Sequence, residues 1–440
     1  MNQPDEAARR SSPKKQRASN PMQRYAVIVD PLGTGQEYAA EFGAAGVEPV
    51  AVLSLAEPPK MYAASWHPEN FRRIHVFDGD LAALADLLRG YQPLCVIPGA
   101  EMGVELAEAL VELVVPGTGH LPGLAPARRD KWQMALAMHR AGVPYLRQTC
   151  SADPGQIERW LRETGLAGQR IVLKPPKSVG TDNVHIVPEG GDWRPFFGQI
   201  YGALNTAGGY NEAVLAEEFA AGTEYMIDSY SAGGRHGLVD VCRYTKLQRG
   251  DRIGIYDLVD FLPPGHPDVQ VLWPYTQQVL DAVGMRNGCG HTEVIITADG
   301  PRLLEVAARP AGGGHQMITK LATGTNHIER TVAHRVRGEF SAGYELVQHV
   351  CSVVISAPRA GIWRNAEIFD GVDQLGTYYA KYFAGGTGDW VPASNDIYTY
   401  LGWVVLASPD EQAMAADYRR IKELESQIKI DPAERAPSPA

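Results

Sequence analysis

The 440-residue chain has few cysteines, no excess of positive charge and no long apolar run. Its five cysteines are scattered and form no CxxC pair, which argues against a disulfide framework and against a zinc knuckle. Lys and Arg total 41 against 51 Asp and Glu, so the chain lacks the overall basic field that nucleic-acid binding requires. No segment approaches the ~20 apolar residues that span a bilayer. We therefore expect a cytoplasmic protein that binds neither nucleic acid nor a membrane.

Both ends of the chain have the composition of disordered tails. Residues 1–23 are rich in Lys, Arg and Ser but have no apolar stretch like that of a secretory signal. We predict a solvated tail there, with a nucleic-acid-binding arm as the alternative. Residues 431–440, rich in Pro and Ala, are predicted to form a second disordered tail.

The remaining length is too great for one core, so we expect several domains. In residues 24–125 short apolar runs alternate with helical segments, which is typical of an α/β domain with a doubly wound parallel sheet. A Pro- and Arg-rich linker at residues 121–130 ends this unit. Residues 126–340 predict an α+β unit with antiparallel strand pairs, and residues 341–430 predict a third unit, also α+β.

Two glycines follow the first predicted strand, but they do not complete a dinucleotide fingerprint. The third glycine of GxGxxG after Gly33 and Gly35 would stand at Tyr38. The acidic residue that usually ends the second strand is also missing, because Ser54 and Leu55 stand there. We interpret the two glycines as turn formers, which disfavours a nicotinamide dehydrogenase.

The stretch LLEVAARPAGGGHQ, residues 303–316, places Glu305 and Arg309 four residues apart. This spacing suits a salt bridge on a helix, but Pro310 and the three glycines after it disfavour a helix. A strand that runs into a glycine loop fits better. The Asp299–Gly300 pair before it is a turn signal between two apolar runs and predicts a hairpin.

Two carboxylates on this hairpin are predicted to be neighbours. If the connecting loop is residues 299–301, Glu293 lies opposite Ala307 and shares a face with Glu305, roughly 7 Å away at Cβ. Two like charges at this distance suit a hard divalent cation such as Mg²⁺. The alternative is two solvated acids on an exposed face. Arg309 and the loop at Gly312 and Gly313 favour a site for an anionic oxygen cluster.

A second candidate site follows the apolar run that ends at Lys174. Lys177, Ser178, Gly180 and Thr181 lie in a loop that returns directly to a strand, so this is not a P-loop. Such a hairpin tip can still cover phosphates with its backbone N–H groups. An ordinary surface turn is the alternative.

Three glutamates bracket the bend that contains Phe219 and Ala220. Glu217 ends a buried strand, where a carboxylate can accept from an exocyclic amine, and the exposed backbone of the bend suits the edge of an adenine ring. Glu218 and Glu224 flank the same bend. The alternative is that these carboxylates are simply solvated surface charges. This alternative is stronger for Glu218 than for Glu217.

In this order the motifs resemble the ATP-grasp superfamily across residues 24–340. Within that superfamily VDPLGTGQEYA, GCGHTEVI and EVAARPAGG are most similar to the L-amino acid ligases of the bacilysin-synthetase type. The resemblance implies the ATP-grasp fold, with an N-terminal Rossmann-like pre-ATP-grasp domain (24–125). The ATP-grasp domain itself would be residues 126–340, with a nucleotide-binding subdomain inserted at about 145–220, before the C-terminal α+β domain.

The resemblance also implies roles at the nucleotide end of the site. Lys131 and Lys174 would bind the ATP phosphates, with the loop of residues 177–181 above them. Glu217 would hold the adenine amine near the backbone of Ala220, and Glu224 would hold the ribose.

At the reacting end, the resemblance implies that Glu293 and Glu305 ligate magnesium. Arg309 would hold the transferred phosphate or the substrate carboxylate, and His291 would line the amino-acid pocket. One position departs from the wider superfamily: many members carry Asn two residues after the second metal glutamate, and here Ala307 stands there. This removes a possible third protein ligand but suits the L-amino acid ligases.

The activity that the resemblance implies is ATP-dependent joining of two L-amino acids into a dipeptide through an acyl phosphate, with release of ADP and phosphate. The implied cofactors are ATP and Mg²⁺, with two ions and Mn²⁺ as a substitute. The family alone also implies a role in antibiotic biosynthesis. The sequence leaves the oligomeric state open, with a homodimer as one alternative. The alternatives are another ATP-grasp carboxylate–amine ligase, acting on a non-standard acid or amine in secondary metabolism, and a nucleotide-binding protein without catalysis.

Overall fold

A computed structural model describes residues 23–206, 208–249, 252–396 and 399–433. Residues 1–22 and 434–440, which belong to the predicted disordered tails, lie outside the described residues. Within the described ranges no helix is both long enough and apolar enough to cross a membrane.

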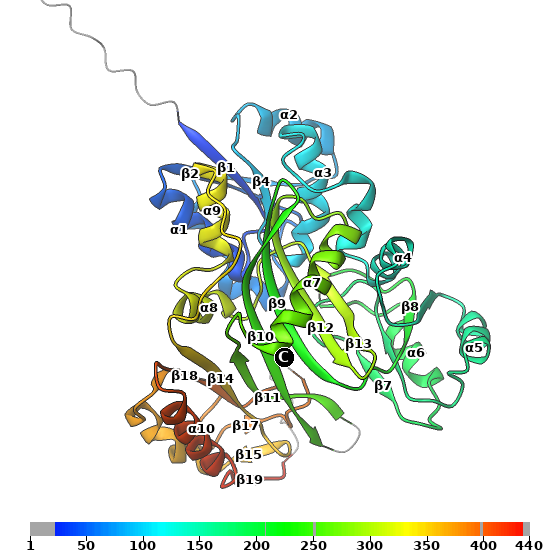
Figure 1. Ribbon diagram of the computed structural model, residues 1–440, viewed down its shortest axis with the longest axis vertical. Helices are drawn as coiled ribbons and strands as arrows, with labels where there is room; N and C mark the ends of the chain where they lie inside the picture. The colour runs from blue at the N-terminus through cyan, green and yellow to red at the C-terminus, as the bar shows by residue number, and fades with distance from the viewer. Residues whose placement is uncertain (1–22, 207, 250–251, 397–398, 434–440) are drawn as a thin grey trace, which may run out of the picture.

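The N-terminal part is built on a four-stranded parallel sheet of order β3-β2-β1-β4, which confirms the predicted parallel architecture. One face packs on α1 and on α9, a helix from much later in the chain, and the other face packs on α2 and α3 (Figure 1). Burial on both faces explains why the strands are continuous apolar runs. The elements are β1 (Arg24–Val29), α1 (Glu37–Ala44), β2 (Val47–Leu53), β3 (Arg73–Val76), α2 (Leu81–Arg89), β4 (Val96–Pro98) and α3 (Val104–Val114), with short 3₁₀ turns η1 (Gly33–Gln36), η2 (Lys60–Ser65), η3 (Pro68–Asn70) and η4 (Glu101–Gly103).

The two glycines after β1 form a tight turn against the loop that follows β4. Gly33 has φ 56, in the left-handed region that glycine adopts without strain. A Cβ added to Gly35 would lie 2.4 Å from the Cα of Gly99, so the two loops touch backbone to backbone. Because β1 and β4 are paired in parallel, these loops meet at the carboxyl ends of both strands, where ligands of α/β sheets commonly bind.

The central part is an eight-stranded antiparallel sheet of order β13-β12-β9-β10-β11-β14-β18-β16. Helices α4 and α7 pack on one face, while α8 lies on the other. The last three strands come from the predicted third unit, so one continuous sheet joins it to the central part. The strands are β9 (Thr223–Ala232), β10 (Arg235–Arg249), β11 (Arg252–Phe261), β12 (Gly288–Thr297), β13 (Gly300–Ala307), β14 (His349–Ile355), β16 (Tyr378–Phe383) and β18 (Gly402–Ser408). The helices, with a 3₁₀ turn, are η5 (Pro122–Arg128), α4 (Lys131–Ala141), α7 (Pro267–Ala282), α8 (His315–Thr323) and α9 (His327–Arg337).

A smaller antiparallel sheet of order β5-β8-β6-β7 projects from the central part (Figure 1). Its apolar face packs against α5 and α6, including Ile157, Leu161 and Phe197. The elements are β5 (Gln148–Ser151), α5 (Pro154–Glu163), β6 (Ile171–Lys174), β7 (His185–Val187), α6 (Arg194–Ile200) and β8 (Val214–Glu218).

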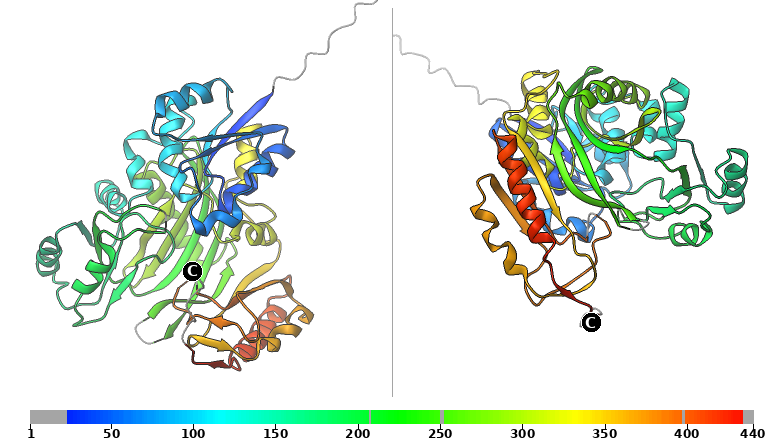
Figure 2. Two further views of the ribbon diagram at one scale, coloured as in Figure 1. Left: turned by 180° about the vertical axis from the view of Figure 1, so that it is seen from behind. Right: turned by 60° about the horizontal axis from the view of Figure 1, so that its bottom comes forward.

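The C-terminal part adds helix α10 over β14 and β18 and a three-stranded sheet of order β17-β15-β19 (Figure 2). Trp363 and Ile421 are buried in its core. Asp431, the first residue of the predicted C-terminal tail, pairs with Ile362 in the small sheet and is therefore ordered. The elements are β15 (Gly361–Trp363), η6 (Ala366–Gln374), β17 (Trp390–Val391), α10 (Glu411–Glu425) and β19 (Ile430–Asp431).

Candidate active site

The hairpin β12–β13 places the two predicted metal carboxylates side by side. Glu293 pairs directly with Glu305, so both side chains leave the same face of the sheet. The predicted register was wrong by two residues. Thr297 pairs with Gly300, which leaves a two-residue turn, and a bulge between Glu293 and Val294 restores the shared face. The two acids are thus direct neighbours rather than diagonal ones.

Basic side chains surround this carboxylate pair. Lys131, at the first turn of α4, lies with its Nζ 2.7 Å from Glu305 Oε2. Burial would raise the pKa of Glu305, but Lys131, Arg309 and His291 lower it to about 2. The carboxylate is therefore charged at neutral pH, as a metal ligand must be.

Glu224 on β9 faces the same region. Burial and the nearby Glu293 raise its pKa, while Lys246 and a hydrogen bond from Tyr256 oppose that shift. Lys246 Nζ lies 2.5 Å from Glu224 Oε2, and the Tyr256 hydroxyl donates to Glu224 Oε1 at 3.2 Å. Three carboxylates and two lysines thus converge on one face, an arrangement suited to a cation together with anionic groups.

Arg309 reaches across to the N-terminal part. Its Nε donates to Glu101 Oε2 at 2.7 Å, and Arg129 Nη1 lies 3.5 Å from the other oxygen of the same carboxylate. Tyr62 belongs to this cluster. Burial raises the pKa of its hydroxyl, while Arg309 opposes that shift and Glu101 adds to it. Sequence reasoning missed Glu101, Arg129 and Tyr62. The position of Glu101 shortly after a parallel strand was the one available signal.

His291 lies next to Glu293 on the same face of β12. Its Nδ1 is 2.7 Å from Asp228 Oδ1 and its Nε2 is 3.7 Å from Glu293 Oε1. Burial would lower the pKa of His291, but Asp228 and Glu293 raise it to about 10. Asp228, buried on β9, was also missed by sequence reasoning.

Lys174 and Glu217 are held together on neighbouring strands of the smaller sheet. Lys174 Nζ lies 2.8 Å from Glu217 Oε1, and the exposed fractions of the two side chains are 8% and 3%. Glu218, the next residue, points the other way and pairs with Arg147 at 2.6 Å. The strand alternation therefore separates the two glutamates, as it must for adjacent residues.

The loop after Lys174 contacts other parts of the chain. Lys177 Nζ lies 2.6 Å from Glu105 Oε1 on α3, and the Ser178 hydroxyl donates to Asp182 at 3.0 Å. Gly180 has φ 62, which favours glycine there. Thr181 Oγ1 is buried and has no hydrogen-bond partner in the described part of the chain, so it is available to an added oxygen ligand.

Around the bend, Phe219 lies beneath the guanidinium of Arg170, 4.1 Å from the ring centroid. On the far side of Arg309, Gly312 begins the glycine loop, and Gly313 follows with φ 66. That loop leads directly into α8.

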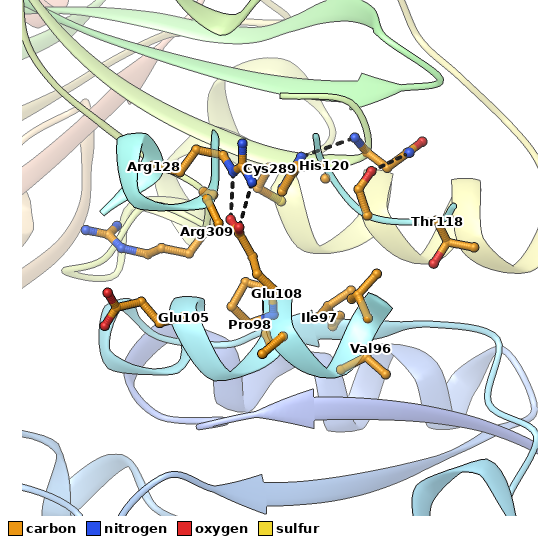
Figure 3. A pocket seen from close by; sticks show the side chains of 18 of the residues that line it. Val96, Ile97, Pro98, Glu105, Glu108, Thr118, His120, Arg128, Cys289 and Arg309 are labelled. Atoms are coloured by element: carbon orange, nitrogen blue, oxygen red, sulfur yellow. Dashed lines mark hydrogen bonds and ion pairs between the residues drawn. The ribbon is translucent and has the colours of Figure 1, made fainter. Parts of the chain in front are cut away.

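A cavity of ≈ 320 Å³ lies between the N-terminal sheet and the central sheet. Of the predicted site residues that the structure describes, Arg309 alone lines it, so the cavity lies beside the carboxylate pair rather than around it. Figure 3 shows Glu108 and Arg128 facing each other there; the Arg128 Nε and Nη2 donate to the two carboxylate oxygens at 2.7 and 2.6 Å. Burial, with Arg128 and Arg335, holds the pKa of His120 on its wall well below the usual value.

The chain has the ATP-grasp fold, and lysines, carboxylates and an arginine converge beside its β12–β13 hairpin. Residues 168–319 match the family model described as the ATP-grasp domain. The chain is 28% identical over 402 residues to dapdiamide A synthase from Enterobacter agglomerans, covering 88% of this chain and 92% of that protein. The enzyme is therefore an ADP-forming ligase that joins a carboxylate to an amine.

Solved structures agree on the fold. The L-amino acid ligase from Bacillus licheniformis superposes with a TM-score of 0.67 at 18% identity, over 94% of this chain and 100% of that one. The biotin carboxylase domain of the 2-oxoglutarate carboxylase from Hydrogenobacter thermophilus, solved with MgADP and bicarbonate, gives a TM-score of 0.59 at 14% identity, over 92% and 90%.

Two lysine ion pairs should differ in their effect on stability: the pair of Lys174 with Glu217 in the smaller sheet, and the pair of Lys177 with Glu105 at the loop after it. Replacing Lys174 with Met leaves Glu217 as a buried charge without a partner, so we expect a loss of about 3–5 kcal/mol in the free energy of unfolding. The matched change Lys177→Met breaks a pair whose exposed fractions are 45% and 56%. It should cost about 0.2–1 kcal/mol. Urea denaturation without nucleotide measures both, and equal losses would contradict the burial argument.

Proposed function

We propose that this ligase joins two L-amino acids into a dipeptide. The carboxylate of one amino acid attacks the γ-phosphorus of ATP, the bond to ADP breaks, and an acyl phosphate forms. The amine nitrogen of the second amino acid attacks the acyl carbon, phosphate leaves, and the nitrogen loses a proton. The observation that carries this proposal is the direct pairing of Glu293 with Glu305 beside Lys131, with Arg309 next to them.

The carboxylate pair fits a divalent cation. Two acids that pair directly across a hairpin repel each other unless positive charge lies between them, and oxygen donors of this kind are the ligands that Mg²⁺ prefers. We assign Glu293 and Glu305 as its ligands, for two Mg²⁺ ions or for Mn²⁺ in their place. When bound, the metal would neutralise charge on the ATP phosphates during transfer.

The remaining residues bind and orient the substrates. We assign Lys131 and Lys174 to the ATP phosphates, Glu217 and the backbone at Ala220 to adenine, and Glu224 to the ribose. The loop of residues 177–181 would close over the phosphates and keep water from the acyl phosphate, and the contact between Lys177 and Glu105 holds it toward α3. The smaller sheet then acts as the nucleotide-binding subdomain.

The amino-acid end is formed by Arg309, His291 and the glycine loop. Arg309 is anchored by Glu101, and His291 by Asp228, so both side chains present fixed groups to a substrate. The likeness to dapdiamide A synthase and to the L-amino acid ligase supports amino acids as the substrate class.

A phosphate-release screen over all pairs of the common L-amino acids tests the proposal. We expect release above background only when ATP, Mg²⁺ and a suitable pair are all present, with a dipeptide mass in the product and no release in excess EDTA. The same screen with non-standard acids and amines is the comparison arm. Release only in that arm would contradict dipeptide synthesis and favour the alternative ligase.

A further inference from the structure

Behind the carboxylate pair, three ionisable residues form a row across three adjacent strands. His291 on β12 pairs with Asp228 on β9, and Asp228 pairs with Asp240 on β10. Paired residues share a face, so all three side chains point toward helices α8 and α9. Asp228 and Asp240 are 0% exposed. A buried carboxylate costs free energy unless its partners compensate, so the contacts of Asp228 show what it does.

The two carboxylate oxygens of Asp228 have different partners: one contacts the site and the other faces the helices α8 and α9. Oδ1 accepts from His291 Nδ1 at 2.7 Å. Oδ2 faces His327 Nδ1 at 3.3 Å and His315 Nε2 at 3.9 Å. His327 is itself fixed, because its Nε2 donates to the Ser229 carbonyl at 2.9 Å. One buried carboxylate thus joins the histidine of the site to α9 and to α8, the helix that follows the glycine loop.

The contact with Oδ1 determines how the His291 ring is presented. With Nδ1 bound to Asp228, the opposite nitrogen Nε2 turns outward and lies 3.7 Å from Glu293 Oε1. The hydrogen bond at one ring nitrogen fixes the orientation of the ring and therefore the direction in which the other nitrogen points. Carboxylates that orient a metal-bound histidine in this way typically contribute about 10–100-fold to activity, and we expect an effect of the same order here.

We propose that Asp228 is a positioning residue for the ligation reaction: it holds His291 by Nδ1 so that Nε2 faces the reacting carboxylate beside Glu293. This inference rests on the proposed function, since it assigns His291 to the amino-acid end of the site. Asp228 does not itself touch a substrate in this arrangement. Its effect on turnover passes through the imidazole ring.

A double-mutant cycle separates positioning from a purely structural role. Asp228→Ala and His291→Gln should each lower kcat by about 10–100-fold. Their combination should be no worse than His291→Gln alone, because the carboxylate has nothing left to orient. Affinity for a fluorescent ATP analogue should stay unchanged. If the two losses multiply in the double variant, or if Asp228→Ala leaves kcat unchanged, the proposal is overturned.

A second variant and a spectroscopic readout cover the case in which Asp228→Ala does not fold. Asp228→Asn keeps an oxygen that accepts from Nδ1, so it should retain more activity than Asp228→Ala. In protein labelled with ¹⁵N-histidine, His291, assigned by loss of its signal in His291→Gln, should show a protonated Nδ1. Asp228→Asn should shift that signal.

Asp240→Asn is the matched control for the spectrum. Asp240 is equally buried, but it accepts from Thr319 at 2.8 Å and does not contact His291, so its variant should leave the His291 signal in place. If Asp240→Asn shifts the signal as much as Asp228→Asn does, the specific pairing is wrong. The spectrum requires no substrate. A failed substrate screen with an intact Asp228-dependent signal would therefore reject the dipeptide proposal and not the pairing.

Discussion

Replacing Glu305 with Gln is expected to lower the rate of phosphate release by about 10³-fold, which corresponds to about 4 kcal/mol of lost transition-state stabilisation. The substituted amide would keep the size of the side chain and a hydrogen-bond acceptor for Lys131. It would lose the negative charge that lies 2.7 Å from Lys131 Nζ. It would also leave Glu293, its partner across the hairpin, as the one carboxylate of the pair. An amide oxygen is a weaker ligand for Mg²⁺ than a carboxylate, so the Mg²⁺ concentration for half-maximal activity should also rise.

Phosphate release measured against Mg²⁺ concentration checks this expectation, with thermal unfolding as the test of the fold. Glu329→Gln is a matched control, because Glu329 pairs with Lys320 between α9 and α8 and has no contact with the carboxylate pair. It should leave both the rate and the Mg²⁺ dependence unchanged. Full activity of Glu305→Gln at ordinary Mg²⁺ would remove Glu305 from the metal site.

The parts of this fold that sequence could predict are those fixed by local patterns. The apolar runs of the N-terminal strands are buried on both faces, and their alternation with helices was enough to predict a parallel sheet. The shared face of Glu293 and Glu305 followed from strand alternation. Their register did not, because the bulge beside Glu293 has no clear sequence signal and offsets a turn one residue shorter than predicted.

The partners of the site residues could not be predicted from the sequence, because they come from strands and loops that are far apart in the chain. Strand β12 lies between β13 and β9, so Asp228 meets His291 only after that order is known. Glu101 and Arg309 are 208 residues apart and meet where the first β-sheet abuts the central one. Charge at a single position does not reveal such pairs, since the same residue types most often stand on solvated surfaces.

The continuous eight-stranded sheet could not be predicted from sequence for the same reason, because its strands are far apart in the chain. Residues 341–430 predicted a separate unit because a change in pattern marks its start, yet β14 pairs with β11. Tyr400 from this last part accepts a hydrogen bond from the backbone N–H of Tyr256, which in turn donates to Glu224 through its hydroxyl. The C-terminal part therefore supports a carboxylate of the site, a link that only the pairing of distant strands reveals.

Arg309 should matter as much as Glu305, and two substitutions can show which group it binds. Its Nε is held by Glu101 and its Nη1 donates to the Pro310 carbonyl, while Nη2 has no hydrogen-bond partner among the described residues. That nitrogen is thus available to an anionic oxygen. Arg309→Ala should lower kcat/KM for ligation by about 10³-fold, the lower end of what a phosphate-stabilising arginine contributes.

Arg309→Lys keeps the charge but loses the planar pair of donors, so most of the loss should remain. The division of the loss between kcat and KM identifies the bound group. If Arg309 holds the transferred phosphate, kcat falls and the KM for the amino acid stays the same, because the contact forms in the transition state. If it holds the substrate carboxylate, the KM for that amino acid rises instead. The matched control Arg364→Ala, which breaks an exposed pair with Asp431, should change neither kcat nor KM. An Arg309→Ala enzyme with normal kcat and KM would exclude Arg309 from the site.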